Sequence, residues 1–119
     1  NPAQTIGFKK YWIYISDLSG KERITVQRPN YTPMPQVFKT VQSAKAAITK
    51  ESNILADSNT PDTLLQAWHE NRKVVQWKMP GESKWSIAAV TGGAASAKEK
   101  ARQLSKKPGY ENAMYRVVG

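Results

Sequence analysis

Cationic, aromatic and polar side chains alternate along two short segments near the start of the chain. Side chains of a β-strand alternate between the two faces of a sheet, so the alternating residues of both segments lie on one face of a predicted sheet. Lys and Arg neutralise phosphates, while Trp and Tyr stack on bases or pack against sugars, so the pattern favours nucleic acid as the partner. A buried second layer or a dimer interface would also use Trp12 and Tyr14. The alternating residues are Lys10, Trp12, Tyr14, Lys21, Arg23, Thr25 and Gln27.

Five of the cations in the second half of the chain are further candidates for binding. Lys98, Arg102 and Lys106 recur every four residues, which places them on one face of a predicted helix. Lys78 and Lys84 flank a predicted turn and would face each other across the hairpin. Their repulsion would cost a few tenths of a kcal/mol, and a nearby anion would relieve it. The alternative interpretation of the helical row is an ordinary solvent-exposed helix face, which also carries charged residues at this spacing. We expect all five to attract a polyanion.

Duplex DNA is the favoured form of this partner. A two-stranded ribbon fits the major groove, where Arg23, Thr25 and Gln27 would reach base edges. The alternative is a protein-interaction module, in which exposed rings and a sheet edge bind an acidic protein or a second copy of the chain.

Residues for catalysis are sparse. The chain has no cysteine and a single histidine, His69, so disulfides, thiolate nucleophiles and cysteine-based metal sites are excluded. The nine Asp and Glu residues are scattered, without a close pair for two-metal or glycosidase chemistry. Gly92 and Gly93 precede a predicted helix but lack the spacing of a phosphate-binding loop. We expect a non-enzymatic protein with no cofactor and no metal site.

The elements that must position these side chains fit one basic α+β domain over residues 1–119. The net charge is +9, and the 39% of hydrophobic and 23% of charged residues suit a folded protein. We expect an antiparallel sheet of about five strands, in two hairpins plus a C-terminal strand, with three helices mostly on one face. No segment has the roughly 20 apolar residues of a membrane span. A soluble protein is expected, cytoplasmic rather than secreted, and a targeting segment removed before Asn1 stays an open alternative.

The first hairpin is predicted from two strands, Phe8–Ser16 and Lys21–Arg28, joined by a turn over Asp17–Gly20. Pairing of Ser16 with Lys21 would fix the register. One face then carries the core residues Tyr11, Ile13, Ile15, Ile24 and Val26, interrupted only by Glu22 near the turn. The other face carries the alternating residues described above. Pro29–Gln36, with three prolines, is predicted as an irregular connection.

The second hairpin is predicted over Lys73–Thr91, with Pro80–Glu82 as a three-residue connection. Its core face would carry Val75, Trp77, Met79, Trp85, Ile87 and Ala89, and its polar face Gln76, Lys78, Lys84 and Ser86.

Three helices and a last strand complete the prediction. The helices cover Val41–Ala56, a short segment from Pro61 capped by Thr60, and a segment opened by a Ser96–Glu99 capping box, and the strand covers Ala113–Val118. The halves 8–56 and 73–118 both run from hairpin to helix, and Ser43-Ala44-Lys45 recurs as Ser96-Ala97-Lys98. A degenerate duplication is one interpretation, and a chance match of helix-forming residues is the other.

Overall fold

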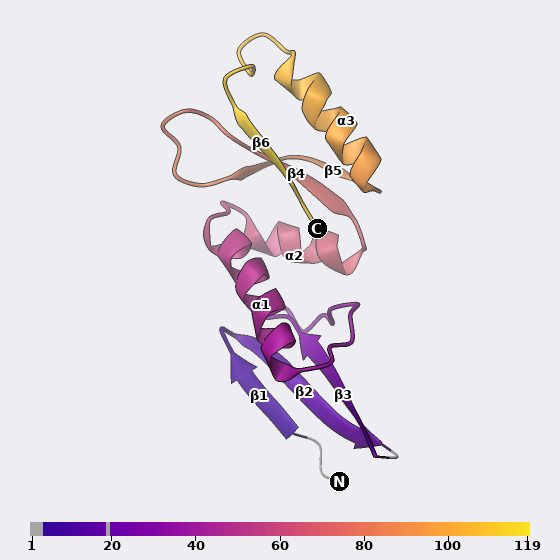
Figure 1. Ribbon diagram of the computed structural model, residues 1–119. Coiled ribbons are helices and arrows are strands. Elements are labelled where there is room, and N and C mark those ends of the chain that lie inside the picture. Colours follow the sequence, from indigo (N-terminus) through magenta and orange to yellow (C-terminus); the bar gives the residue numbers. More distant parts are fainter. Residues whose placement is uncertain (1–3, 19) are drawn as a thin grey trace. The chain divides into compact units, whose positions relative to one another are not determined.

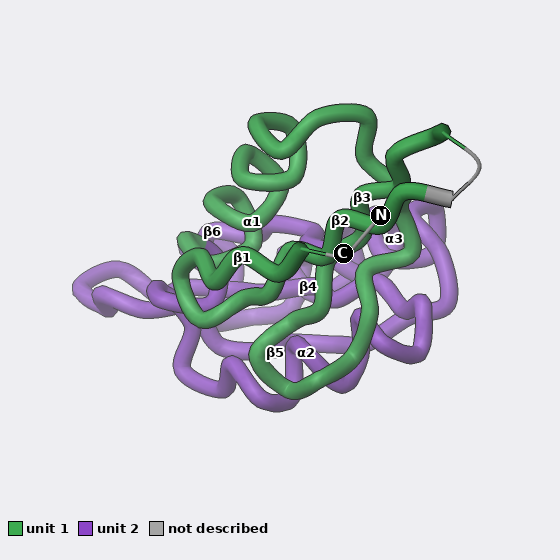
Figure 2. The backbone as a smooth tube through the Cα atoms, turned by 90° about the horizontal axis from the view of Figure 1, so that it is seen from below, with its two compact units in different colours: residues 1–53 green, residues 54–119 purple. Residues whose placement is uncertain are grey.

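The chain forms two compact units, residues 1–53 and residues 54–119 (Figure 2). The computed structural model describes residues 4–18 and 20–119. Each unit holds a three-stranded antiparallel sheet, and the described chain has three helices (Figure 1). The predicted α+β class with antiparallel hairpins is confirmed. The strands form two sheets of three rather than one of about five, because an additional N-terminal strand completes the first sheet and the C-terminal strand completes the second.

The first sheet has the order β1-β2-β3, with β1 at Gln4–Phe8, β2 at Tyr11–Leu18 and β3 at Lys21–Gln27. The predicted single strand Phe8–Ser16 is wrong at its start, because Lys9 and Lys10 form a tight turn between β1 and β2. Both lysines have positive φ, 53° and 71°. Two-residue hairpin turns of this kind favour Asn and Gly, so a Lys-Lys pair carries no turn signal.

The hairpin of β2 and β3 keeps its predicted faces although its register differs. Ser16 lies opposite Arg23 instead of Lys21. This shift of two residues leaves the side chains of β2 and β3 on their predicted faces, because side chains alternate with period two. Lys10, predicted on the same face as Trp12, lies instead in the turn before β2. The predicted core residues Tyr11, Ile13, Ile24 and Val26 are buried. Residue 19, inside the predicted turn, lies outside the described residues.

Helix α1 spans Val41–Ala56, as predicted, and its first thirteen residues belong to the first unit. Its own residues Ala44 and Ile48 are buried. Its Glu51 carboxylate accepts hydrogen bonds from the Tyr11 hydroxyl (3.0 Å) and from Nε and Nη2 of Arg28 (3.0 and 2.9 Å). These contacts join α1 to the buried face of the first sheet.

The proline-rich connection runs along the outer side of β3. The backbone N–H of Met34 donates to the carbonyl of Val26 (2.9 Å), and that of Phe38 donates to Ile24 (2.8 Å). The predicted irregular connection is confirmed. It also pairs part of an edge that would otherwise be open to another chain.

The second sheet has the order β5-β4-β6. Two helices join the strands. The elements are α2 at Pro61–His69, β4 at Lys73–Lys78, β5 at Ser86–Thr91, α3 at Ala94–Ser105 and β6 at Met114–Val118.

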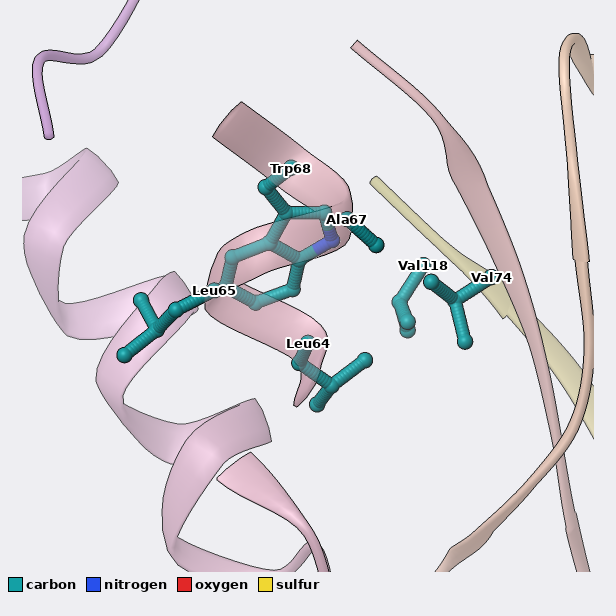
Figure 3. Packing of buried hydrophobic residues seen from close by; sticks show 6 residues of the cluster. All are labelled: Leu64, Leu65, Ala67, Trp68, Val74 and Val118. Carbon is teal, nitrogen blue, oxygen red and sulfur yellow. The ribbon is translucent and has the colours of Figure 1, made fainter. Parts of the chain in front are cut away.

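Helices α2 and α3 cover opposite faces of the second sheet. Leu64 and Trp68 of α2 pack with Val74 and Val118 (Figure 3). The neighbouring Val75 is also fully buried, and adjacent side chains of a strand point to opposite faces. Since α3 contacts β4, β5 and β6, the Val75 side is the one that α3 covers.

The second hairpin departs from its predicted pattern. Its register shifts between Val75 and Gln76, so Val75 pairs with Ala89 but Gln76 pairs with Ile87. The polar placement predicted for Gln76 is wrong, because its side chain is fully buried. The strands are joined by residues 79–85 rather than by a three-residue connection.

Helix α3 begins at Ala94 with Gly93 as its N-cap. The predicted capping box is wrong, because Ser96 lies inside the helix and the Glu99 carboxylate binds Arg102. Ser96 Oγ donates to the carbonyl of Gly93, just as Ser43 Oγ donates to the carbonyl of Thr40 in α1.

The repeated Ser-Ala-Lys triplet occupies the third to fifth positions of both α1 and α3. Its alanine, Ala44 or Ala97, is fully buried in each helix. Each helix also follows a hairpin whose first strand is central in its sheet. Duplication stays a prediction, and these shared positions agree with it.

Candidate nucleic-acid interface

The side of the first sheet opposite α1 carries exposed rings. We call it the open face. Trp12 is 42% exposed and Tyr14 is 37% exposed, and both belong to the central strand β2. The strand registers place its residues on one side of the sheet: Thr5, Gly7, Trp12, Tyr14, Ser16, Lys21, Arg23, Thr25 and Gln27.

The Trp12 indole lies on the backbone of Gly7, its partner across β1. A Cβ atom at Gly7 would lie 3.2–3.7 Å from three atoms of the six-membered ring of Trp12. The absence of a side chain at Gly7 therefore lets the ring lie close to the sheet. The six-membered ring of the indole therefore packs against β1, while 42% of the Trp12 surface stays exposed.

Tyr14 is held by a chain of hydrogen bonds across β3. Its hydroxyl donates to Oε1 of Gln27 (2.6 Å), and Nε2 of Gln27 donates to the carbonyl of Tyr31 (3.0 Å). Tyr31 is 75% exposed and has φ of 66°, a conformation that bulky residues rarely adopt. The hydrogen bonds to Tyr14 and Tyr31 thus occupy both the oxygen and the nitrogen of the Gln27 amide within the first unit.

Charge is sorted between the two faces of the hairpin. Lys21 and Arg23 lie on the open face, whereas Asp17 and Glu22 are cross-strand partners on the other side. The strands β1–β3 thus place no carboxylate on the open face. Residues 1–53 contain eight Lys and Arg and three Asp and Glu, a net charge of +5. This surface is suited to an anionic partner.

The predicted cationic row of the second unit is exposed along α3. Lys98 and Arg102 belong to α3 and Lys106 is its C-cap, and all three are exposed. Arg102 is also paired with Glu99: its Nε lies 3.0 Å from Oε2. The hydrogen bond from Arg102 lowers the pKa of the Glu99 carboxyl, and the same bond raises the pKa of Arg102. Part of the charge of this row is therefore neutralised within the helix.

Lys78 and Lys84 do not face each other, which corrects the predicted pairing. Lys78 lies opposite Met114 of β6, and Lys84 lies in the exposed connection before β5. Seven residues separate the strands, so the tight hairpin that would have paired the lysines does not form. Nζ of Lys78 instead lies 5.1 Å from the ring centroid of Trp85.

A hydrogen-bonded cluster surrounds Arg116 in the second unit. Its Nε donates to Oε1 of Gln76 (2.8 Å) and its Nη2 donates to Oδ1 of Asp57 (2.6 Å). The guanidinium also lies 4.3 Å from the Trp85 ring centroid, and Nε2 of Gln76 donates to Ser58 (2.9 Å). Because these groups bind one another, we assign the cluster to stability rather than to ligand binding.

The predicted site residues thus divide between the two units. The open face brings together Trp12, Tyr14, Arg23, Thr25 and Gln27, while the second unit holds Lys78, Lys84, Lys98, Arg102 and Lys106. Sequence reasoning missed Gly7 and Tyr31. A glycine at an alternating position beside aromatic residues is a signal for Gly7, but none pointed to Tyr31.

Other kinds of site find little support in the described residues. Residues 4–18 and 20–119 contain no group of three or more His, Cys, Asp or Glu that could hold a metal ion. Among the helices described, none is long and apolar enough to cross a membrane. Comparison with protein families, curated proteins and solved structures finds no match to this chain.

Proposed function

We propose that this protein is a non-enzymatic nucleic-acid-binding module that docks through the open face. The observation that carries the proposal is a pair of exposed rings, Trp12 and Tyr14, on a sheet face whose strand charges are all positive. Cations bind phosphates and release their counterions, and rings add contacts with bases and sugars. The exposed row on α3 would add long-range attraction, which scales with net charge.

Duplex DNA, the form favoured by the sequence pattern, would be read by Arg23 and Thr25. Gln27 is less suited to this role, because pairing with an adenine edge requires both ends of its amide. Those ends already bind Tyr14 and Tyr31. The proposal therefore depends on phosphate and ring contacts more than on reading of base edges.

A salt titration tests the proposal. Labelled single-stranded and duplex DNA are titrated with protein at several salt concentrations, and the logarithm of affinity should fall linearly with the logarithm of salt concentration. Arg23→Gln should reduce the slope by roughly 0.7–0.9 for each phosphate that the arginine no longer neutralises. Lys50→Gln is the matched control, because it removes the same charge from the exposed side of α1 in the same unit.

Two results would overturn this function. One is no binding to any nucleic acid at low salt by a folded protein. The other is an equal effect of Arg23→Gln and Lys50→Gln, which would mean that net charge alone attracts the polymer.

A protein-interaction module is the second candidate. It is favoured by the position of β1 at the edge of the first sheet, since edge strands can pair with a strand of another chain. Rings such as Trp12 are also common anchors of protein interfaces. Self-association, or tighter binding to polyglutamate than to DNA, would support this candidate and contradict nucleic-acid binding.

A further inference from the structure

We infer that the open face binds single-stranded nucleic acid, with Trp12 and Tyr14 as platforms on which unpaired bases stack. This inference rests on the proposed function and adds the form of the polymer. Its support comes from the position of the two rings, their spacing, and the cations beside them.

The geometry of Trp12 suits stacking. Gly7 supports the six-membered ring from below, with three ring atoms 3.2–3.7 Å from the position that a Cβ would take. The ring thus lies against β1, and Trp12 keeps 42% of its surface exposed to solvent, where a base could stack. Stacking on such a surface is tolerant of sequence, because every base has a π-face.

The spacing of the rings favours an unstacked strand. Trp12 and Tyr14 are two residues apart on β2, so their Cα atoms are separated by about 6.8 Å. Bases stacked in a duplex follow one another every ~3.4 Å along each strand, with both faces covered by neighbours. Two adjacent bases can occupy both rings only in an extended strand whose bases have separated.

The hydrogen bonds of Tyr14 hold its ring ready for a base. Its hydroxyl is fixed by Gln27, which is itself fixed by the carbonyl of Tyr31. A side chain that is already ordered loses less entropy when it binds. The same bonds occupy the amide that would otherwise read a duplex base edge, so they favour stacking over groove recognition.

A cation lies beside the rings. Arg23 precedes Thr25, the cross-strand partner of Tyr14, by two positions on β3 and lies on the same face. Diagonal neighbours of this kind lie about 7–8 Å apart, within reach of a long side chain. Bases stacked on β2 would therefore leave their phosphates near Arg23.

The test compares three labelled polymers of equal length, about 12 nucleotides: oligothymidine, its duplex with oligoadenine, and an abasic strand with the same phosphates. Oligothymidine should bind at least tenfold more tightly than the abasic strand. Trp12→Leu should weaken oligothymidine binding by about 5- to 150-fold, because leucine can cover Gly7 but has no π-face. Trp12→Phe should retain most of the affinity.

Tyr110→Leu is the matched control, because Tyr110 is a similarly exposed ring in the second unit, stacked on Trp77. It should leave binding unchanged. Equal binding of the abasic strand and oligothymidine, or an equal effect of Trp12→Leu and Tyr110→Leu, would overturn stacking while leaving the proposed function intact. Binding to none of the polymers would overturn both. Circular dichroism establishes that each variant is folded.

Discussion

Of the three arginine–carboxylate pairs among the described residues, two differ sharply in burial, and replacing each of their arginines by methionine should change the stability of the protein by different amounts. Arg28 and Glu51 are only 5% and 18% exposed, with Nη2 2.9 Å from Oε2. Arg102 and Glu99 are 58% and 49% exposed. Arg28→Met should strongly destabilise the protein, whereas Arg102→Met should leave its stability nearly unchanged.

The size of the effect follows from what Arg28→Met leaves behind. Glu51 loses two charge-assisted hydrogen bonds and keeps the one from the Tyr11 hydroxyl. Removing one partner of a fully buried pair costs about 3–5 kcal/mol, and the residual exposure of Glu51 favours the lower end, about 3 kcal/mol. At a typical urea slope of about 1–3 kcal/mol per M, the unfolding midpoint should fall by about 1–3 M.

The assay is urea unfolding followed by circular dichroism. The triple replacement Arg28→Met, Glu51→Leu and Tyr11→Phe should recover most of the stability that Arg28→Met removes, because the charges and the hydroxyl of this cluster are then replaced together. A midpoint for Arg28→Met no lower than that for Arg102→Met would refute the role of burial. A triple variant less stable than Arg28→Met alone would refute it as well.

Three further predictions concern stability. Burial, followed by the charge of Glu51, raises the pKa of Tyr11 above its ordinary value of 10.0. The neutral Tyr11 hydroxyl therefore makes its full contribution to the free energy of unfolding below pH 10.0, and this contribution declines above pH 10.0, where the unfolded chain loses the proton first. When urea midpoints are measured from below to above pH 10.0, the midpoint of Tyr11→Phe should fall less steeply with pH than that of the unchanged protein. Ala44→Leu should cost about 1–3 kcal/mol by overpacking a fully buried position, while Ala46→Leu, on the exposed side of α1, should change thermal stability little. Gln76→Leu should lower the urea midpoint by an amount equivalent to about 1–3 kcal/mol, since it removes buried partners of Arg116 and Ser58; unchanged unfolding would contradict the role assigned to that cluster.

The first hairpin was predictable because its faces are chemically distinct. Tyr11 and Ile13 alternate with Trp12 and Tyr14, and a register error of two residues cannot exchange the faces. Helix α1 was equally clear, since its apolar spacing is regular and three prolines precede it. The residues of β2 and β3 on the open face could therefore be predicted from the sequence.

Long-range interactions account for what the sequence did not reveal. Gln76 has a polar side chain, which predicts exposure. It is buried because its amide forms hydrogen bonds with Arg116 and Ser58, which are distant in the sequence. The bulge beside it also breaks the alternation on which the second hairpin was predicted. Strand β1 was missed because a turn of two lysines resembles the continuation of a polar strand.

The indole signals of the four tryptophans test the central claim most directly. Trp12 is exposed on the open face, whereas Trp68 is buried, Trp77 is stacked on Tyr110 and Trp85 lies beneath Arg116. In a ¹H–¹⁵N NMR titration with oligothymidine, the Trp12 indole should shift progressively while the other three change little. Shifts confined to the indoles of the second unit, or none at saturating oligothymidine, would contradict binding at the open face.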